Sequence, residues 1–172
     1  MKLKLGIAIA VLLTATLAFA QKVNIDYDHA FDFSSVHTFA VQFATPWNNP
    51  LQQERAKTDI VQQLTSKGWT EAPNPASADV VVAIHGAVQQ QKSLDTFYSG
   101  GGWGWGPGMS QTSVNTVNVG TLVVDLLNTH TKQLIFRGTA TDQLSNKPQK
   151  NTEKLDKALE KMFKDFPPKP KS

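Results

Sequence analysis

The feature that most constrains the fold is the stretch at residues 120–140, GTLVVDLLNTHTKQLIFRGTA. Two runs rich in branched apolar residues flank a polar segment, NTHTK, whose residue types favour turns. Alternate residues of each run share a strand face, so the stretch predicts a β-hairpin. If Leu126 pairs with Phe136, Asp125 lies opposite Arg137 on the other face. Such a charge pair contributes about 0.2–1 kcal/mol and helps to fix the register, so we expect its role to be structural.

The remaining segments alternate between strand-like and helix-like patterns. Asn49 predicts the N-cap of a helix that ends at Gly68, with Leu51 on its apolar stripe. Thr152 predicts the N-cap of a second, more amphipathic helix. Further strands are predicted at residues 22–27, 36–43, 80–91 and 111–119, the last with a bulge near Val114. The fold class is α+β, a mainly antiparallel sheet of about five to six strands with two helices packed on one face.

The first twenty residues have the composition of a targeting segment. Lys2 and Lys4 precede an apolar run that is too short to span a bilayer and that ends in Ala-Phe-Ala. This pattern predicts a signal peptide at residues 1–20, cleaved after Ala20, and therefore a periplasmic or secreted protein. A single domain would occupy residues 21–166, with a flexible tail at residues 167–172. The chain has no cysteine, which excludes disulfides, thiolate metal sites and lipidation on cysteine.

Charge is distributed unevenly along the chain. The formal net charge is +3, and removal of the two leader lysines lowers it to +1. Residues 147–172 carry eight lysines and four acids, whereas residues 21–146 carry seven basic and ten acidic side chains. The lysine-rich C-terminal helix could contact an anionic surface, although a solvated helix explains the pattern as well. No nucleic-acid partner is expected of an exported protein.

A glycine- and tryptophan-rich stretch, residues 98–109, separates the strands at residues 80–91 and 111–119. It carries neither the P-loop pattern nor a strand–GxGxxG–helix setting, so no phosphate cradle is predicted. Tyr98, Trp103 and Trp105 are candidate ligand-binding residues, because exposed aromatic side chains at a loop tip commonly bind a partner, a glycan or a membrane interface. The alternative is that one or both tryptophans fold back onto the sheet and cap the core.

Residues capable of catalysis or metal binding are scattered and match no motif. Asp26 and Asp28 share a strand face beside His29, and a second set combines Asp32 and Ser34 with His37. Neither set has the spacing of a helical zinc site, an EF-hand or a nucleophile elbow. We therefore predict no catalytic residue, no metal site and no cofactor.

Several segments together resemble the bacterial domain-of-unknown-function 4136 (DUF4136) family. The most specific are Asp32-Phe33-Ser34, Ala78-Asp79-Val80 and the hairpin that runs from Asp125 to Gly138. The resemblance covers essentially the whole mature chain and implies an envelope protein, often a lipoprotein in this family. This chain departs from that pattern because it has no cysteine to be lipidated. The family supplies no catalytic residues.

The sequence favours a non-enzymatic periplasmic or cell-envelope domain for binding or scaffolding. Its partner would be an envelope component or a protein, recognised through Tyr98, Trp103 and Trp105. The alternative is a metal-assisted hydrolase that acts on an envelope component through Asp26, Asp28 and a histidine.

Overall fold

The computed structural model describes residues 21–98 and 110–168, with the backbone alone for residues 93–98, 110 and 111. The predicted signal peptide and the last four residues of the predicted tail lie outside this range. In chain order the elements are β1 (Lys22–Tyr27), η1 (Phe33–Ser35), β2 (Thr38–Phe43), α1 (Pro50–Ser66), β3 (Thr70–Glu71), η2 (Pro75–Ser77), β4 (Val80–Tyr98), β5 (Ser110–Asn128), β6 (Leu134–Gln143) and α2 (Pro148–Phe163).

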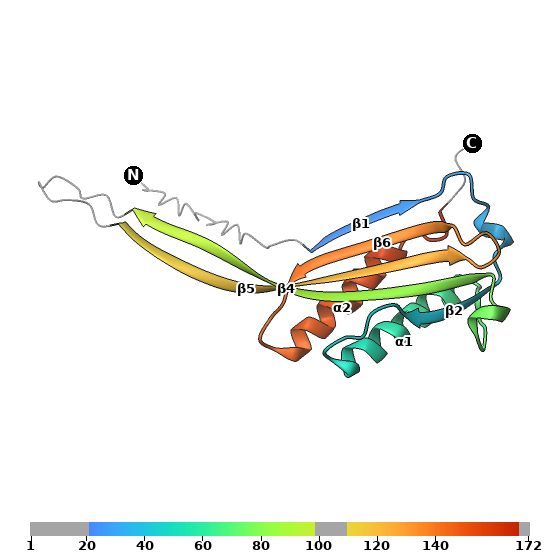
Figure 1. Cartoon of the computed structure of the whole chain (residues 1–172), viewed down its shortest axis with the longest axis horizontal. Helices are drawn as coiled ribbons and strands as arrows, with labels where there is room; N and C mark the ends of the chain where they lie inside the picture. The colour runs from blue at the N-terminus through green and yellow to red at the C-terminus, as the bar shows by residue number, and fades with distance from the viewer. Residues whose placement is uncertain (1–20, 99–109, 169–172) are drawn as a thin grey trace, which may run out of the picture.

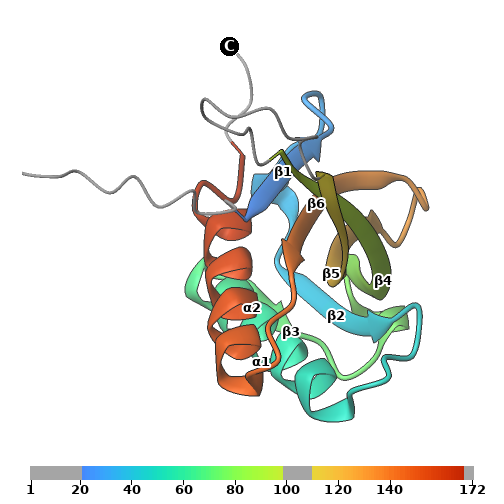
Figure 2. The same ribbon diagram turned by 90° about the vertical axis from the view of Figure 1, so that its left-hand side faces the viewer.

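The strands form one six-stranded sheet in the order β1-β6-β5-β4-β2-β3. Pairing is antiparallel from β1 to β4, whereas β2 runs parallel to both β4 and β3. The parallel pair follows from a crossover, because α1 carries the chain from the end of β2 back to the start of β4. Both helices lie on one face of the sheet (Figure 2). The predicted α+β class with a mainly antiparallel sheet is confirmed, and the parallel pairs made by β2 give the sheet its mixed character.

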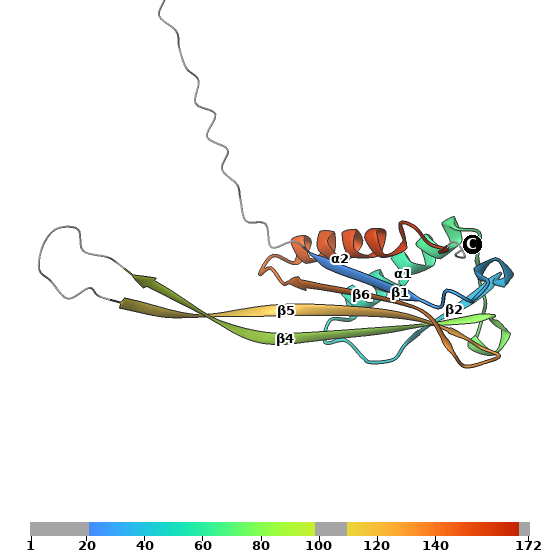
Figure 3. The same cartoon turned by 90° about the horizontal axis from the view of Figure 1, so that it is seen from above.

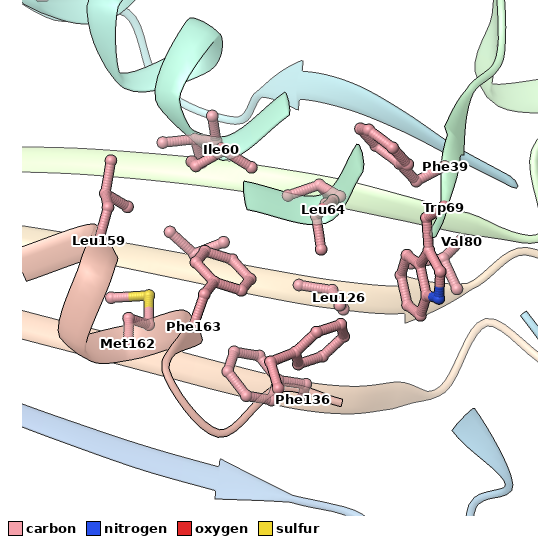
Figure 4. Close-up of a cluster of buried hydrophobic side chains, with 14 of the residues drawn as sticks. Phe39, Ile60, Leu64, Trp69, Val80, Leu126, Phe136, Leu159, Met162 and Phe163 are labelled. Carbon is pink, nitrogen blue, oxygen red and sulfur yellow. The ribbon is translucent and has the colours of Figure 1, made fainter. Parts of the chain in front are cut away.

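The hydrophobic core fills the space between the sheet and the two helices (Figure 4). Strand residues that share the helix-facing side, such as Val80, Leu126 and Phe136, are at most 2% exposed. The helices contribute Ile60 and Phe163, which are fully buried. This face-specific burial is what the period-2 and helical patterns of the sequence require.

The ends of α1 are those predicted. The side chain of Asn49 accepts a hydrogen bond from the Gln52 amide at 3.1 Å, which satisfies one of the free N–H groups of the first turn. At the other end Gly68 has φ = +93°, a conformation that side chains with a Cβ rarely adopt. The chain then turns so that Trp69, only 4% exposed, enters the core. Leu51 was placed on the buried stripe wrongly, because it is 83% exposed.

The second helix begins earlier than the sequence suggests. Pro148 occupies its first turn, and Lys147 is an N-cap without a side-chain hydrogen bond. Thr152 therefore lies inside the helix, where its hydroxyl accepts a hydrogen bond from Gln52 Nε2 at 2.9 Å rather than capping. The helix ends at Phe163, and Phe166 is buried in the irregular segment that follows.

The strands also differ from prediction in detail. A short 3₁₀ turn, capped by the Asp32 side chain, delays the start of β2 to Thr38. The bulge predicted near Val114 is wrong, because β4 and β5 keep one register throughout. The pairing irregularity falls instead between β5 and β6, at Leu126 and Leu127.

Neither helix within residues 21–98 and 110–168 combines the length and apolar character needed to cross a bilayer.

Candidate functional site in the projecting hairpin

The longest elements of the described residues, β4 and β5, reach far beyond the rest of the sheet (Figures 1 and 3). They pair without a register shift from Val80 opposite Asn128 to Tyr98 opposite Ser110. Their neighbours stop much earlier, because β2 pairs with β4 only as far as Ile84 and β6 with β5 only from Val119 onward. We call the two-stranded remainder, residues 89–98 and 110–118, the arm.

Both edges of the arm are open. Ile84 O accepts from Ala44 N and Asn118 O accepts from Leu144 N, so these residues direct backbone groups outward at the base of the arm. In an extended strand every second residue directs its N–H and C=O to the same side. The even-numbered residues of both strands therefore present backbone groups along the two edges. Within the described part of the chain, no further strand pairs with these edges.

The described side chains of the arm contribute little to the hydrophobic core. Its side chains at residues 89–92 and 112–116 are exposed. Val114 is 57% exposed, and Val88 at the arm's base is 59% exposed. Lys92 and Asp95 are the only charged residues of the arm sequence. The arm therefore lacks the dense charges and prolines with which proteins usually protect open strand edges.

Of the aromatic residues predicted to bind a ligand, Tyr98 belongs to the arm. Tyr98 is the last residue of β4, which places its backbone at the distal end of the β4–β5 pairing. The side chain of Tyr98 and the whole of Trp103 and Trp105 lie outside the described residues. Their role as a recognition loop stays a prediction.

The predicted pair of Asp125 and Arg137 lies on the sheet face opposite the helices. The register places the two residues opposite each other, and Arg137 donates from Nε and Nη2 to the two carboxylate oxygens of Asp125, both at 2.6 Å. Asp125 is only 5% exposed. This pairing raises the pKa of the Arg137 guanidinium, through its hydrogen bonds to Asp125 and the opposite charge. The arrangement stabilises the register and leaves the carboxylate without a free oxygen.

His85 also lies beside this pair, a contact that was not predicted. Its Nε2 lies 3.6 Å from Oδ2 of Asp125. The sequence could have indicated this contact only through the strand register. Ala83 is the residue of β4 opposite Asp125, and His85 is the next residue of β4 on the same face.

The residues of the hydrolase alternative occupy separate positions around β1. Asp26 lies opposite Arg137, and the Asp28 carboxylate accepts from the Ala30 amide at 2.9 Å. The Asp32 carboxylate accepts from the hydroxyl of Ser34 at 2.6 Å, and this bond lowers the pKa of Asp32. The ring of His29 packs edge-on against Tyr27. Across the residues that the structure describes, no three histidine or acidic side chains gather as a metal site would need.

The lysine-rich helix predicted to contact an anionic surface is α2. Lys157 and Lys161 are exposed, whereas Lys154 bonds Asp142 Oδ1 at 3.0 Å. The lysines outside this ion pair are those available for such a contact.

The family of the protein follows from its sequence as a whole. The family model described as "Domain of unknown function (DUF4136)" matches residues 23–168. The chain belongs to the DUF4136 family. A comparison with curated proteins finds no match.

Two solved structures share the DUF4136 fold seen here. A DUF4136 family protein from Bacteroides thetaiotaomicron is 14% identical, with a TM-score of 0.54, 86% of this chain covered and 96% of that one. A PDZ domain protein from Parabacteroides distasonis is 15% identical, with a TM-score of 0.55 and 87% of this chain covered. This chain spans only 35% of that protein's length. At these identities the likeness shows the fold alone.

Proposed function

We propose that this DUF4136 protein is exported to the cell envelope and serves there as a non-enzymatic binding or scaffolding domain that recognises its partner through the arm. The observation that carries the proposal is the pairing of β4 with β5 far beyond their neighbours in the sheet. An isolated two-stranded hairpin is at best marginally stable in water, because it buries too little apolar surface. An arm that adds little to the core therefore has a role in contacts outside the domain.

Two properties of the arm support recognition of an envelope component or a protein. Its open edges offer rows of backbone N–H and C=O groups to which an extended segment can add as a strand. Its exposed side chains, which include Gln90, Thr112 and Thr116, supply polar contacts. The predicted loop with Trp103 and Trp105 would add aromatic contacts at the distal end.

The test removes the arm and preserves the sheet. Gln89 and Val119 are directly paired, so replacing residues 90–118 with Asn-Gly joins them by a two-residue turn of the type that favours hairpins. Wild type, this clipped variant and the double variant Trp103→Ala/Trp105→Ala are sedimented separately with peptidoglycan sacculi and with anionic vesicles. We expect wild type to co-sediment with one of these materials and the clipped variant to remain in the supernatant.

The outcomes separate the parts of the proposal. A folded clipped variant that sediments like wild type would exclude the arm as the recognition element. Loss of sedimentation in the double variant as well would assign recognition to the loop, whereas retention would assign it to the strands. Vesicle binding that survives clipping but is lost in Lys157→Glu/Lys161→Glu would assign membrane contact to α2. Export is tested separately by N-terminal sequencing of the protein from a cell fraction, where Gln21 is the expected first residue.

A further inference from the structure

We propose that a cavity at the base of the arm binds a small, uncharged and mainly apolar molecule. The cavity has a volume of about 440 Å³ and lies on the helix side of the sheet, between β4, β5 and β6 and the first turns of α1 and α2. We call it the base cavity. Its volume falls within the range of small-molecule sites in proteins, about 300–1,000 Å³.

Two small strand residues, Gly86 and Ala140, line the base cavity on the side of the sheet. One row across the sheet reads Gly86, Leu122 and Ala140. On α2 the cavity is lined by Asn151, Lys154, Leu155 and Ala158, and Ala158 is only 3% exposed. Toward the other end of the sheet this face is filled by Phe136 and its neighbours. The space next to Gly86 is itself filled by the Trp47 indole, which lines the cavity.

Two side chains that line the cavity lie in close contact with glycine residues of the sheet. The indole of Trp47 lies directly on Gly86, where any Cβ would collide with its ring. Leu144 lies over Gly120 in the same way, with its Cδ2 2.9 Å from the place of a Cβ. Both side chains line the cavity, so they give it one aromatic and one aliphatic wall.

Several polar groups at the rim are already bonded, whereas the buried Nε1 of the lining Trp47 has no hydrogen-bond partner among the described residues. Lys154 and Asp142 form an ion pair at 3.0 Å, so the rim presents no uncompensated charge from this pair. Gln52 donates to Thr152, and Gln21 Nε2 donates to the backbone oxygen of Lys154 at 2.6 Å. A charged ligand would lose its hydration and gain no opposite charge in return. An apolar ligand gains contact with the two walls.

The size of the ligand follows from the volume. At about 30 Å³ for each water molecule of the liquid, the cavity holds on the order of fifteen waters. A molecule of roughly ten to fifteen non-hydrogen atoms would displace them. An aliphatic chain of medium length or a small aromatic ring system meets this description.

The test measures calorimetric binding of methyl octanoate to the full chain, with octanoate and maltose as matched charged and polar probes. We expect saturable binding of the ester with a rise in melting temperature, binding of octanoate at least tenfold weaker, and no binding of maltose. Ala158→Leu, which adds bulk at a lining position, should weaken ester binding at least tenfold.

A matched pair of exposed valines controls for folding. Val88 lines the cavity and Val114 lies on the arm away from it, and both are more than half exposed. Val88→Asp should weaken ester binding, and Val114→Asp should leave it unchanged. Absence of saturable ester binding, equal affinity for octanoate, or unchanged affinity in Val88→Asp would each overturn the proposal. If Ala158→Leu does not fold, the valine pair still decides.

Discussion

The carboxylates of Asp59 on α1 and Asp156 on α2 face each other where the two helices meet. Oδ2 of Asp59 and Oδ1 of Asp156 are both buried, and neither has a hydrogen-bond donor among the described residues. Burial, together with the neighbouring Asp156 carboxylate, raises the pKa of Asp59 to about 6. Arg55, whose Nη1 lies 3.8 Å from Asp156 Oδ2, offsets this only in part.

The first prediction concerns the pH dependence of stability. Because the pKa of Asp59 is higher in the folded than in the unfolded protein, the folded state binds more protons between about pH 4 and pH 6. The stability that this carboxyl contributes is therefore present below pH 4 and is lost as pH rises through 6. Asp59→Asn should raise the melting temperature at pH 7.5 and have a smaller effect at pH 4. Glu54→Gln, at an exposed position on the same helix, is the control and should change neither value.

The second prediction concerns the buried carboxylate of the outer sheet face. Arg137→Ala leaves Asp125 buried without its guanidinium, and should cost about 2–3 kcal/mol in the free energy of unfolding. That value is set below the range for fully buried pairs because half of the Arg137 side chain is exposed. The double variant Asp125→Ala/Arg137→Ala should lose less than the sum of the two single variants. Strict additivity in urea unfolding would contradict a direct interaction.

The third prediction separates two roles of glycine. Gly86→Ala should destabilise the fold by about 1–3 kcal/mol, because the new Cβ drives the Trp47 ring out of place. Gly68→Ala meets no neighbouring atom but must adopt φ = +93°, which costs about 1 kcal/mol. Asparagine tolerates that backbone region better, so Gly68→Asn should recover part of the loss, whereas Gly86→Asn should not. Equal behaviour of the two asparagine variants in chemical denaturation would argue against this distinction.

The fourth prediction concerns the start of β2. The Asp79 carboxylate accepts hydrogen bonds from the amides of His37 and Thr38, at 3.0 and 2.8 Å, and from the Thr38 hydroxyl. These hydrogen bonds lower the pKa of Asp79, and the bond from the His37 amide has the largest effect. The stability that they contribute is therefore present above about pH 4 and is lost as pH falls further. Asp79→Ala should lower the free energy of unfolding by about 1 kcal/mol at pH 7 and by less at pH 3. The value at pH 7 allows for the solvent exposure of Asp79. An equal loss at both values would contradict the assignment.

The features that could be predicted from sequence are those encoded within one segment. The turn and the alternation around it predict the register that pairs Leu126 with Phe136. Asn49 and Gly68 mark the ends of α1 because caps and left-handed glycines act within a few residues. The start of α2 was missed because a lysine followed by Pro148 is typical of a loop as well as of a first helical turn.

The features that were missed depend on which elements meet. The parallel pairing of β2 with β4 is a contact across the crossover helix, and periodicity within either strand does not specify its neighbour. The contact between Asp59 and Asp156 depends on how the two helices pack, and the base cavity on small residues brought together from three strands. Of the predicted recognition residues, only the position of Tyr98 along β4 falls within the described backbone.

The arm has a mechanical consequence for the domain. Its two strands continue into the middle of the sheet, where β2 flanks β4 over five residue pairs and β6 flanks β5 over nine. A pull along the arm therefore acts parallel to these strands and shears the hydrogen bonds that hold them. The hydrogen bonds of the β2–β4 and β5–β6 pairs therefore carry the load together and do not open one after another. A partner bound to the arm is thus connected to the central strands of the sheet. Tension would reach these strands before it reached the edge strands β1 and β3.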